Sequence, residues 1–325
     1  MIDRAIPRRT ALGSVLALAL AACSSPSGSS TPRAGADGLR KVTVGVLPVV
    51  ECAPVYLGIK QGIFRKHGLE ITTQQFPGGS AIMPAVIAGQ VQFGFSNVIS
   101  LLAARERGVP LLSVVGAGTS TGDRVRDINA IVVNDSSDLR SPLDLVDRKV
   151  AINAWNNLGD TTVRVAVKKS GGDHWRIQFV RIPFPEMPAK LTSGAVDAIW
   201  VSEPLRSVVL SGGGRQLFNN LTETYPKVQV AQYFTTEQVK QQDGSLVTAF
   251  VDSLKEATAY ASEHPNEVYG ILSSYVKVSA AVAPTIVLPD WTADLAQEST
   301  QALGEAAHEF GTLWKSPDVT GLFGL

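Results

Sequence analysis

The sequence predicts an α/β fold made of two lobes of similar design with a ligand cleft between them. Two observations lead to this prediction. Strands alternate with helices along most of the chain after Leu39, and one phrase occurs once in each of two successive blocks. Such alternation is typical of a parallel sheet with helices on its faces. We therefore expect each lobe to contain a mixed, mostly parallel sheet flanked by helices.

The repeated phrase reads MPAVIAGQVQFGFSN at 83–97 and MPAKLTSGAVDAIWVSEP at 187–204. Each copy predicts a helix with Pro in its first turn, a Gly exit, and a strand that finishes at small polar residues. Ligands of open α/β sheets bind at the carboxyl ends of the strands. The two copies therefore predict that Ser96–Asn97 and Ser202–Glu203 face each other across the cleft.

The elements of the first block follow from β-branched strand residues and from Gly exits. Strands are expected at 41–47, 69–76, 91–95 and 111–115, and helices at 53–60, 81–88 and 97–107.

The second block continues the alternation, and the chain becomes helical from Leu246 onward, with interruptions at three prolines. Strands are expected at 129–133, 150–153, 177–182, 195–200, 217–218 and 228–233, and helices after Ser141, at 186–192 and at 206–210. The stretch 160–170 fits either a strand or a helix. We favour a helix because Asp160 can cap its start, while two lysines and Gly171 suit its end.

The N-terminus predicts export and a lipid anchor. Arginines at 4, 8 and 9 precede an apolar run at 11–22 that is too short to span a bilayer. This run ends in LAAC at 20–23, which resembles the bacterial lipobox, so we expect a signal peptide at 1–22 and a lipid on Cys23. An ordinary cleavage site beside a chance Cys is the alternative, and Sec and twin-arginine export both remain open. Residues 23–38 are expected to be a flexible tether at the outer face of the cytoplasmic membrane.

Composition excludes several function classes. The formal net charge is +0, and no basic patch with interleaved aromatic residues predicts nucleic-acid binding. Besides Cys23 the chain has only Cys52, and the four His residues lie far apart, so neither a disulfide, a metal site nor a cofactor is expected. The stretch 116–121 falls short of a dinucleotide-binding fingerprint. No catalytic pattern is readable, and we expect a protein that is not an enzyme.

An ordered set of motifs carries a family resemblance. APVYLGIKQGIF at 53–64, HGLE at 67–70, GGS at 78–80, AGQVQFG at 88–94, SPLDLVDRKVAI at 141–152 and GAVDA at 194–198 occur in this order. Together they resemble the nitrate/sulfonate/taurine-type substrate-binding proteins of ABC importers, a family that also includes binders of thiamine-precursor pyrimidines. The resemblance implies the type II periplasmic-binding-protein fold, hinge closure on a small molecule, a monomer, and an ABC permease with its ATPase as partners.

The resemblance also implies the division of the chain and the location of the site. Lobe 1 is expected at 39–126 plus 235–325 and lobe 2 at 127–234, with crossings near 121–129 and 228–236. Family members bind ligand at strand ends and helix N-termini, where backbone N–H groups suit an anionic group. The residues at such positions are Cys52, Ala53, Gly78, Gly79, Ser80, Ser96, Asn97, Asn157, Gly159, Asp160, Thr161, Trp200 and Glu203. Each of them also has a purely structural interpretation, as a turn, cap or core residue.

The expected ligand is a small organic anion: a sulfonate, a taurine-like molecule or an aromatic carboxylate. Asp160 and Glu203 would repel a bare sulfonate or nitrate unless a ligand amine or a cation pairs with them, so a thiamine-precursor pyrimidine is the alternative. Arg124 or Arg126 could clamp a carboxylate, or could simply be solvated. A ligand sensor without transport is a further alternative. An enzyme of this fold is less favoured, because the pyrimidine synthase of this fold carries a Cys-rich motif that is absent here.

Overall fold

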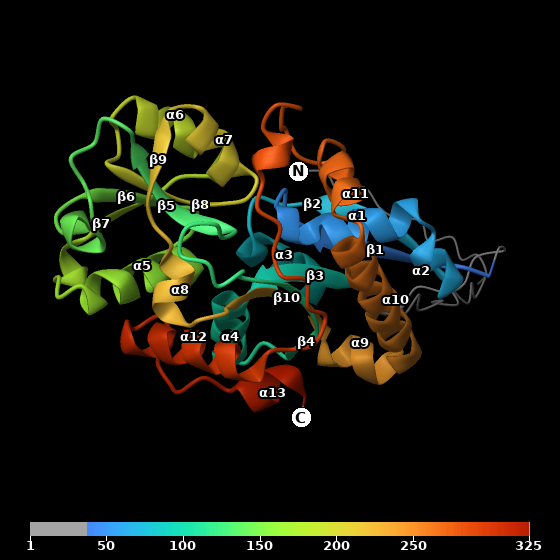
Figure 1. Cartoon of the computed structure of the whole chain (residues 1–325). Coiled ribbons are helices and arrows are strands. Elements are labelled where there is room, and N and C mark those ends of the chain that lie inside the picture. The colour runs from blue at the N-terminus through green and yellow to red at the C-terminus, as the bar shows by residue number, and fades with distance from the viewer. Residues whose placement is uncertain (1–37, 325) are drawn as a thin grey trace, which may run out of the picture. The chain divides into compact units, whose positions relative to one another are not determined.

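The structure, a computed structural model, describes residues 38–324. They form two lobes, each built on a five-stranded sheet (Figure 1). The first sheet has the order β2-β1-β3-β10-β4, from β1 (Arg40–Val46), β2 (Leu69–Gln75), β3 (Phe93–Asn97), β4 (Leu111–Thr119) and β10 (Gln229–Thr236). The second has the order β7-β6-β8-β5-β9, from β5 (Asn129–Asn134), β6 (Lys149–Ile152), β7 (Gln178–Arg181), β8 (Ala198–Ser202) and β9 (Gly214–Phe218). The signal peptide, Cys23 and the tether up to residue 37 lie outside the described residues.

The two sheets share one topology, and the predicted fold class is confirmed. In the first sheet β10 runs antiparallel to both of its neighbours, β3 and β4. In the second sheet β5 runs antiparallel to β8 and β9 in the same way. In parallel orientation, β1 pairs with β2 and β3, and β6 pairs with β7 and β8, as the alternation of helices and strands predicts.

The chain crosses between the lobes at 120–128, between β4 and β5, and again at 219–228, between β9 and β10. The second crossing differs from the one expected at 228–236, because these residues form β10, a strand of the first sheet. Residues up to Phe234, which the sequence assigned to lobe 2, therefore pair within lobe 1. Sheet membership is set by long-range pairing, which the local strand pattern does not contain.

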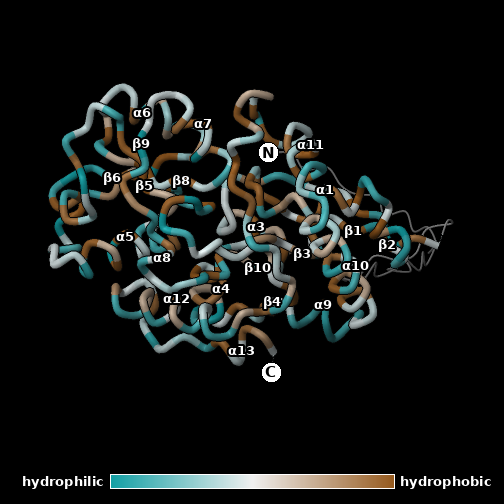
Figure 2. Tube along the Cα trace, in the orientation of Figure 1, coloured by the Kyte–Doolittle hydropathy of each residue, from teal (hydrophilic) through white to brown (hydrophobic). Residues whose placement is uncertain are grey.

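Helices cover both faces of each sheet. In the first lobe these are α1 (Ala53–Lys60), α2 (Ile63–Lys66), α3 (Gly79–Ile87), α4 (Val98–Glu106), α9 (Glu237–Gln242), α10 (Gly244–Glu263), α11 (Pro265–Leu272), α12 (Gln297–Glu309) and α13 (Val319–Phe323). In the second lobe α5 (Leu158–Lys169) and α8 (Asn220–Thr224) lie on one face of the sheet, and α6 (Met187–Thr192) and α7 (Leu205–Ser211) on the other (Figure 1). Hydrophobic residues concentrate in the strands and on the inner sides of the helices (Figure 2). Phe250 of α10 stacks on Phe93 of β3, with 3.8 Å between ring centroids.

Most predicted elements are confirmed with shifts of a few residues at their ends. The ambiguous stretch 160–170 lies in helix α5, where Asn157 and Asp160 form a capping box. The repeated phrase falls on α3 and α6, the helices that precede β3 and β8, so its two copies share the order of helix and strand. The expected Pro in the first helical turn is found in α6, whereas α3 begins earlier, at Gly79, and Pro84 lies inside it. Both strands end later than expected, so Asn97 and Ser202 are strand residues rather than loop residues.

One further expectation differs from the structure. Residues 273–296 contain only one short 3₁₀ helix (Ala283–Thr285), although the sequence indicated a largely helical C-terminal region. Prolines at 284 and 289 prevent a regular helix there. The glycine-rich stretch from Gly116 lies within β4, which runs through to Thr119, and not in a turn that opens a helix. Within 38–324, no helix combines the length and the apolar character needed to cross a membrane.

Candidate functional site

A cavity of about 50 Å³ lies between the two lobes. The first lobe contributes Leu47, Val49, Glu51, Gly79, Phe95, Asn97, Val230 and Ala231, and the second contributes Asn129, Asn153, Asn157, Leu158, Phe184, Trp200 and Ser202. A water needs at least about 10–15 Å³ of such volume, so the cavity has room for about three to five water-sized groups. That is the size of one small ring.

The cavity is formed by matching positions of the two sheets. Phe95 of β3 corresponds to Trp200 of β8, and Asn97 corresponds to Ser202 as the last residue of its strand. The neighbouring antiparallel strands add Ala231, which pairs with Asn97, and Asn129, which pairs with Ser202. The structure thus brings Asn97 and Ser202 to one cavity, at the strand ends where the repeated phrase led us to expect a site.

Four buried polar atoms that belong to lining residues have no hydrogen-bond partner among the described residues. They are Oε2 of Glu51, Oδ1 of Asn129, Oδ1 of Asn153 and Nε1 of Trp200. Buried polar atoms are normally paired, and leaving one unpaired costs about 1–3 kcal/mol. A ligand that offers N–H donors to the three oxygens and an acceptor to the indole N–H would satisfy all four.

Glu51 is the carboxyl of this cavity, and it was not among the site residues predicted from the sequence. Its side chain is 3% exposed, and its Oε1 accepts a hydrogen bond of 3.3 Å from Oγ of Ser202 in the other lobe. Burial raises the pKa of Glu51 to about 7; the carboxylates of Glu203 and Asp127 also raise it, and the Ser202 hydroxyl opposes them. The sequence did contain one signal for a role of Glu51 in the site. Glu51 lies between the first strand and the first helix, at the carboxyl end of that strand, where ligands of such sheets bind.

Aromatic side chains form one wall of the cavity. The rings of Phe184 and Trp200 lie 5.5 Å apart, and Phe95 lines the cavity from the first lobe. Gly159 lets the start of α5 approach Trp200, because a Cβ there would lie 2.7 Å from Cε3 of the ring. Gly79 likewise lets the start of α3 approach β3, because a Cβ at Gly79 would lie 2.3 Å from Oγ of Ser96.

We expect Gly159→Ala to lower the free energy of unfolding by about 1–3 kcal/mol, because the added methyl overpacks against Trp200. Urea denaturation measures the change. Gly270→Ala in α11 is the matched control, since no atom lies within 4 Å of its added Cβ, and it should gain about 0.5–1 kcal/mol. Equal effects of the two substitutions would contradict the close approach at Gly159.

The remaining predicted residues of lobe 1 lie around the cavity without lining it. Cys52 and Ala53 are fully buried in the core, and burial raises the pKa of the Cys52 thiol to about 12. Ser96 is buried with an unpaired hydroxyl oxygen. Ser80 lines a different hollow, between α3, α4 and the loop before α5, and a Cβ on Gly78 would lie 3.9 Å from Asn153.

In lobe 2, Asp160 serves the capping box. Its carboxylate accepts the backbone N–H groups of Asn156 (2.8 Å) and Asn157 (2.7 Å), and burial raises its pKa against these hydrogen bonds. Thr161 is buried next to it with an unpaired hydroxyl. Asn157 itself reaches the cavity. Arg124 and Arg126 are exposed and do not line the cavity.

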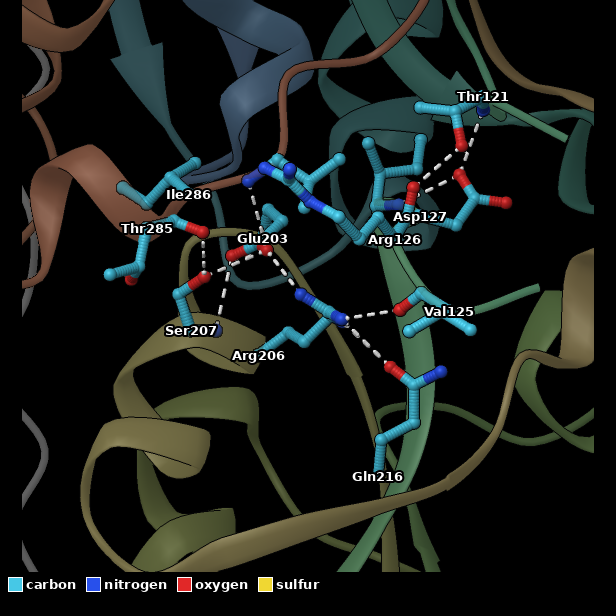
Figure 3. A network of polar contacts seen from close by, with 12 residues as sticks. Thr121, Val125, Arg126, Asp127, Glu203, Arg206, Ser207, Gln216, Thr285 and Ile286 are labelled. Atoms are coloured by element: carbon cyan, nitrogen blue, oxygen red, sulfur yellow. Dashed lines mark hydrogen bonds and ion pairs between the residues drawn. The ribbon is translucent and has the colours of Figure 1, made fainter. Parts of the chain in front are cut away.

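Glu203 is not among the lining residues of this cavity. It lies in a saturated polar network (Figure 3). Its carboxylate accepts hydrogen bonds from Nη1 of Arg206 (3.1 Å), Oγ of Ser207 (2.9 Å), N–H of Ser207 (3.1 Å) and N–H of Val287 (3.2 Å). Burial raises the pKa of Glu203, and Arg206 and the other donors oppose the shift. The acidic wall expected at Glu203 is therefore provided by Glu51, from the opposite lobe.

The same network joins the lobes and their crossings. Val287 belongs to the first lobe, and the N–H of Val50 donates to the carbonyl oxygen of Glu203 at 3.1 Å. Nη2 of Arg206 donates to the carbonyl oxygen of Val125 in the first crossing at 2.9 Å (Figure 3). Nδ2 of Asn219 in the second crossing donates to Oδ2 of buried Asp127 in the first at 2.8 Å. Polar contacts thus tie the two crossings to each other and to the lobes.

No group of three or more His, Cys, Asp or Glu side chains within 38–324 is placed to hold a metal ion. The lining residues of the cavity include no Arg, Lys or His, and Glu51 is their one carboxyl. The arrangement suits capture of a small, hydrogen-bonding molecule with an aromatic or flat part.

Comparison with known proteins gives a consistent picture. The profile of the family described as "NMT1/THI5 like" matches residues 50–268. A protein of Brucella abortus, named as a candidate binding protein, is 21% identical over 230 residues, or 68% of this chain and 67% of that protein. A protein of Haemophilus influenzae, named as a candidate thiamine biosynthesis protein, is 24% identical over 228 residues, or 69% of each chain. Among solved structures, the periplasmic aliphatic sulphonate-binding protein SsuA of Escherichia coli superposes with a TM-score of 0.71 at 19% identity, over 86% of this chain and 91% of that chain. This last likeness shows the periplasmic-binding-protein fold.

Proposed function

Because the chain belongs to the NMT1/THI5-like family, we propose that it is an extracytoplasmic solute-binding protein, which closes on a small molecule and delivers it to an ABC permease and its ATPase. The observation that carries this proposal is the cavity between the lobes, with four unpaired buried polar atoms on its lining residues. Ligand shifts an open–closed equilibrium about the two crossings, because only the closed form surrounds it. The protein binds its solute and releases it unchanged, as a monomer.

The chemistry of the cavity favours the pyrimidine alternative over a small organic anion. An anionic group would lie near Glu51 with no Arg, Lys or His among the lining residues to pair with it. A flat nitrogen heterocycle with an amino group fits better, since its N–H groups can donate to Glu51 and the Asn oxygens while a ring nitrogen accepts from Trp200. The Haemophilus influenzae relative, through its name, supports a thiamine-precursor pyrimidine as the ligand class.

The location follows from the N-terminus. Cys23 and the tether lie outside the described residues, so the anchor rests on the sequence LAAC at 20–23. A lipid on Cys23 would hold the lobes at the outer face of the membrane, within reach of a permease.

Binding of 4-aminopyrimidine is the expected result that tests the ligand class. At a hundred times its Kd it should add about 2.7 kcal/mol to the free energy of unfolding, which thermal shift detects. Benzoate, taurine, methanesulfonate and nitrate are the competing probes. We expect Glu51→Gln to weaken 4-aminopyrimidine binding about tenfold to a hundredfold, because a hydrogen bond to a charged group is lost.

Glu256→Gln is the control for this substitution, because Glu256 is exposed on α10, outside the cleft. Small-angle X-ray scattering should show compaction with any probe that binds tightly. If an anion binds and Glu51→Gln leaves its affinity unchanged, the pyrimidine class is wrong while the binding function stands. No shift and no compaction with any probe would contradict the binding function itself.

A further inference from the structure

A second cavity of about 320 Å³ adjoins the first one. The two share Val49, Phe184 and Ser202 as lining residues, so they meet at these side chains. We call the 50 Å³ cavity the inner cavity and the second one the antechamber. On the side of the second lobe, the antechamber is formed by the end of β8, the loop that follows it, the first turns of α7 and residues 184–185. On the side of the first lobe, it is formed by residues 48–49, Gln75 and residues 275–277.

The antechamber differs from the inner cavity in chemistry. Its wall is mainly apolar, with Pro185, Leu205, Val208 and Val276 among its lining residues. Two of its polar groups already have partners: Nε2 of Gln75 donates to the carbonyl oxygen of Tyr275 at 2.9 Å, and the carboxylate of Glu203 is saturated. The exposed Lys277 is the cationic residue of its lining.

None of the unpaired buried polar atoms among the described residues belongs to an antechamber residue. The inner cavity therefore offers hydrogen bonds, while the antechamber offers apolar surface.

The two volumes indicate how a ligand would be divided between them. The inner cavity holds about one small ring, whereas about 320 Å³ lies within the range of ordinary small-molecule pockets. An apolar wall that faces water lacks the hydrophobic stabilisation that a covering apolar group would add. A ligand consisting of a small polar ring alone would leave the antechamber wall uncovered.

We propose that the solute has two parts: a hydrogen-bonding head in the inner cavity and an attached apolar ring or short chain that lies in the antechamber. This inference rests on the proposed function, because the head occupies the binding cavity and pairs with Glu51. Phe184 and Val49 stand at the junction and contact both parts.

The test compares 4-aminopyrimidine, a head alone, with 5-benzyl-4-aminopyrimidine, the same head with an apolar ring, by isothermal titration. We expect the wild-type protein to bind the benzyl compound about tenfold to a hundredfold more tightly, the effect of burying one large apolar group. In Val208→Phe, which fills the antechamber from α7, this ratio should fall to about one. Leu143→Phe places a ring at an exposed position of the same lobe and should leave the ratio unchanged.

The outcomes separate the two proposals. If both compounds bind the wild type equally, or if Val208→Phe leaves the ratio unchanged, the antechamber is not a subsite while the binding function stands. The pair benzoate and 4-benzylbenzoate repeats the comparison with an anionic head. Failure of all four compounds to bind would overturn the two-part ligand together with the ligand class on which it rests.

Discussion

Replacing Glu203 with Ala is expected to lower the free energy of unfolding by about 3–5 kcal/mol, because it leaves the buried guanidinium of Arg206 without its counter-ion. Glu203 is 0% exposed and Arg206 is 6% exposed, so neither charge has water as a substitute partner. Without the carboxylate, the guanidinium of Arg206 and the N–H of Val287 both lose an acceptor. Urea denaturation with circular dichroism measures the loss.

Two controls show whether the loss comes from the buried network. Glu256→Ala removes a carboxylate that pairs with Lys66 and His67 at the surface, and it should cost less than about 1 kcal/mol. The double variant Glu203→Leu/Arg206→Leu removes both buried charges and should be more stable than Glu203→Ala alone. If Glu203→Ala costs no more than Glu256→Ala, the network does not hold the lobes as described.

The ligand-free protein is expected to lose about 3 kcal/mol of stability through Glu51 as the pH rises from 4.5 to 7. Burial raises the folded-state pKa of this carboxyl from 4.5 to about 7. The folded state keeps the proton through this window while the unfolded state has lost it, so stability is fully present below pH 4.5 and falls until pH 7. A difference of about 2.5 pKa units corresponds to the stated loss, at 1.36 kcal/mol per unit.

The measurement compares urea unfolding of the wild type and Glu51→Gln at pH 4.5 and pH 8. The other titrating groups contribute equally to both proteins, so the difference isolates Glu51. We expect the variant to become more stable relative to the wild type, by about 3 kcal/mol, on going from pH 4.5 to pH 8. Glu256→Gln should show no such gain. Parallel pH profiles of the wild type and Glu51→Gln would contradict the burial of an unpaired carboxyl at this place.

These two acids also show where sequence reasoning stops. Glu51 and Glu203 each follow the end of a strand, and as glutamates they have the same intrinsic acidity. Glu203 has its counter-ion on the following helical turn, at Arg206, so the i, i+3 spacing was a local signal that it is already paired. Glu51 has no such neighbour, and its position at the cavity depends on how the two lobes meet. The choice between them needed tertiary structure.

The elements themselves were largely predictable because their signals are local. Helix α5 followed from a capping residue, helical spacing and a Gly exit, and the two-lobe fold followed from the repeated phrase. The membership of β10 was not predictable in the same way, since its residues read as a strand in either lobe. Its neighbours, β3 and β4, lie more than a hundred residues earlier in the chain.

The position of β10 has a consequence for the order in which the lobes can form. All five strands of the second sheet lie between Asn129 and Phe218, so that sheet can pair as soon as its own segment is available. The first sheet lacks the strand between β3 and β4 until β10, which is made later, inserts there. Until then these strands present two open edges, the feature that invites pairing with other chains. The N-terminal lobe is therefore the last to be completed, and it is the half of the newly made chain most exposed to aggregation.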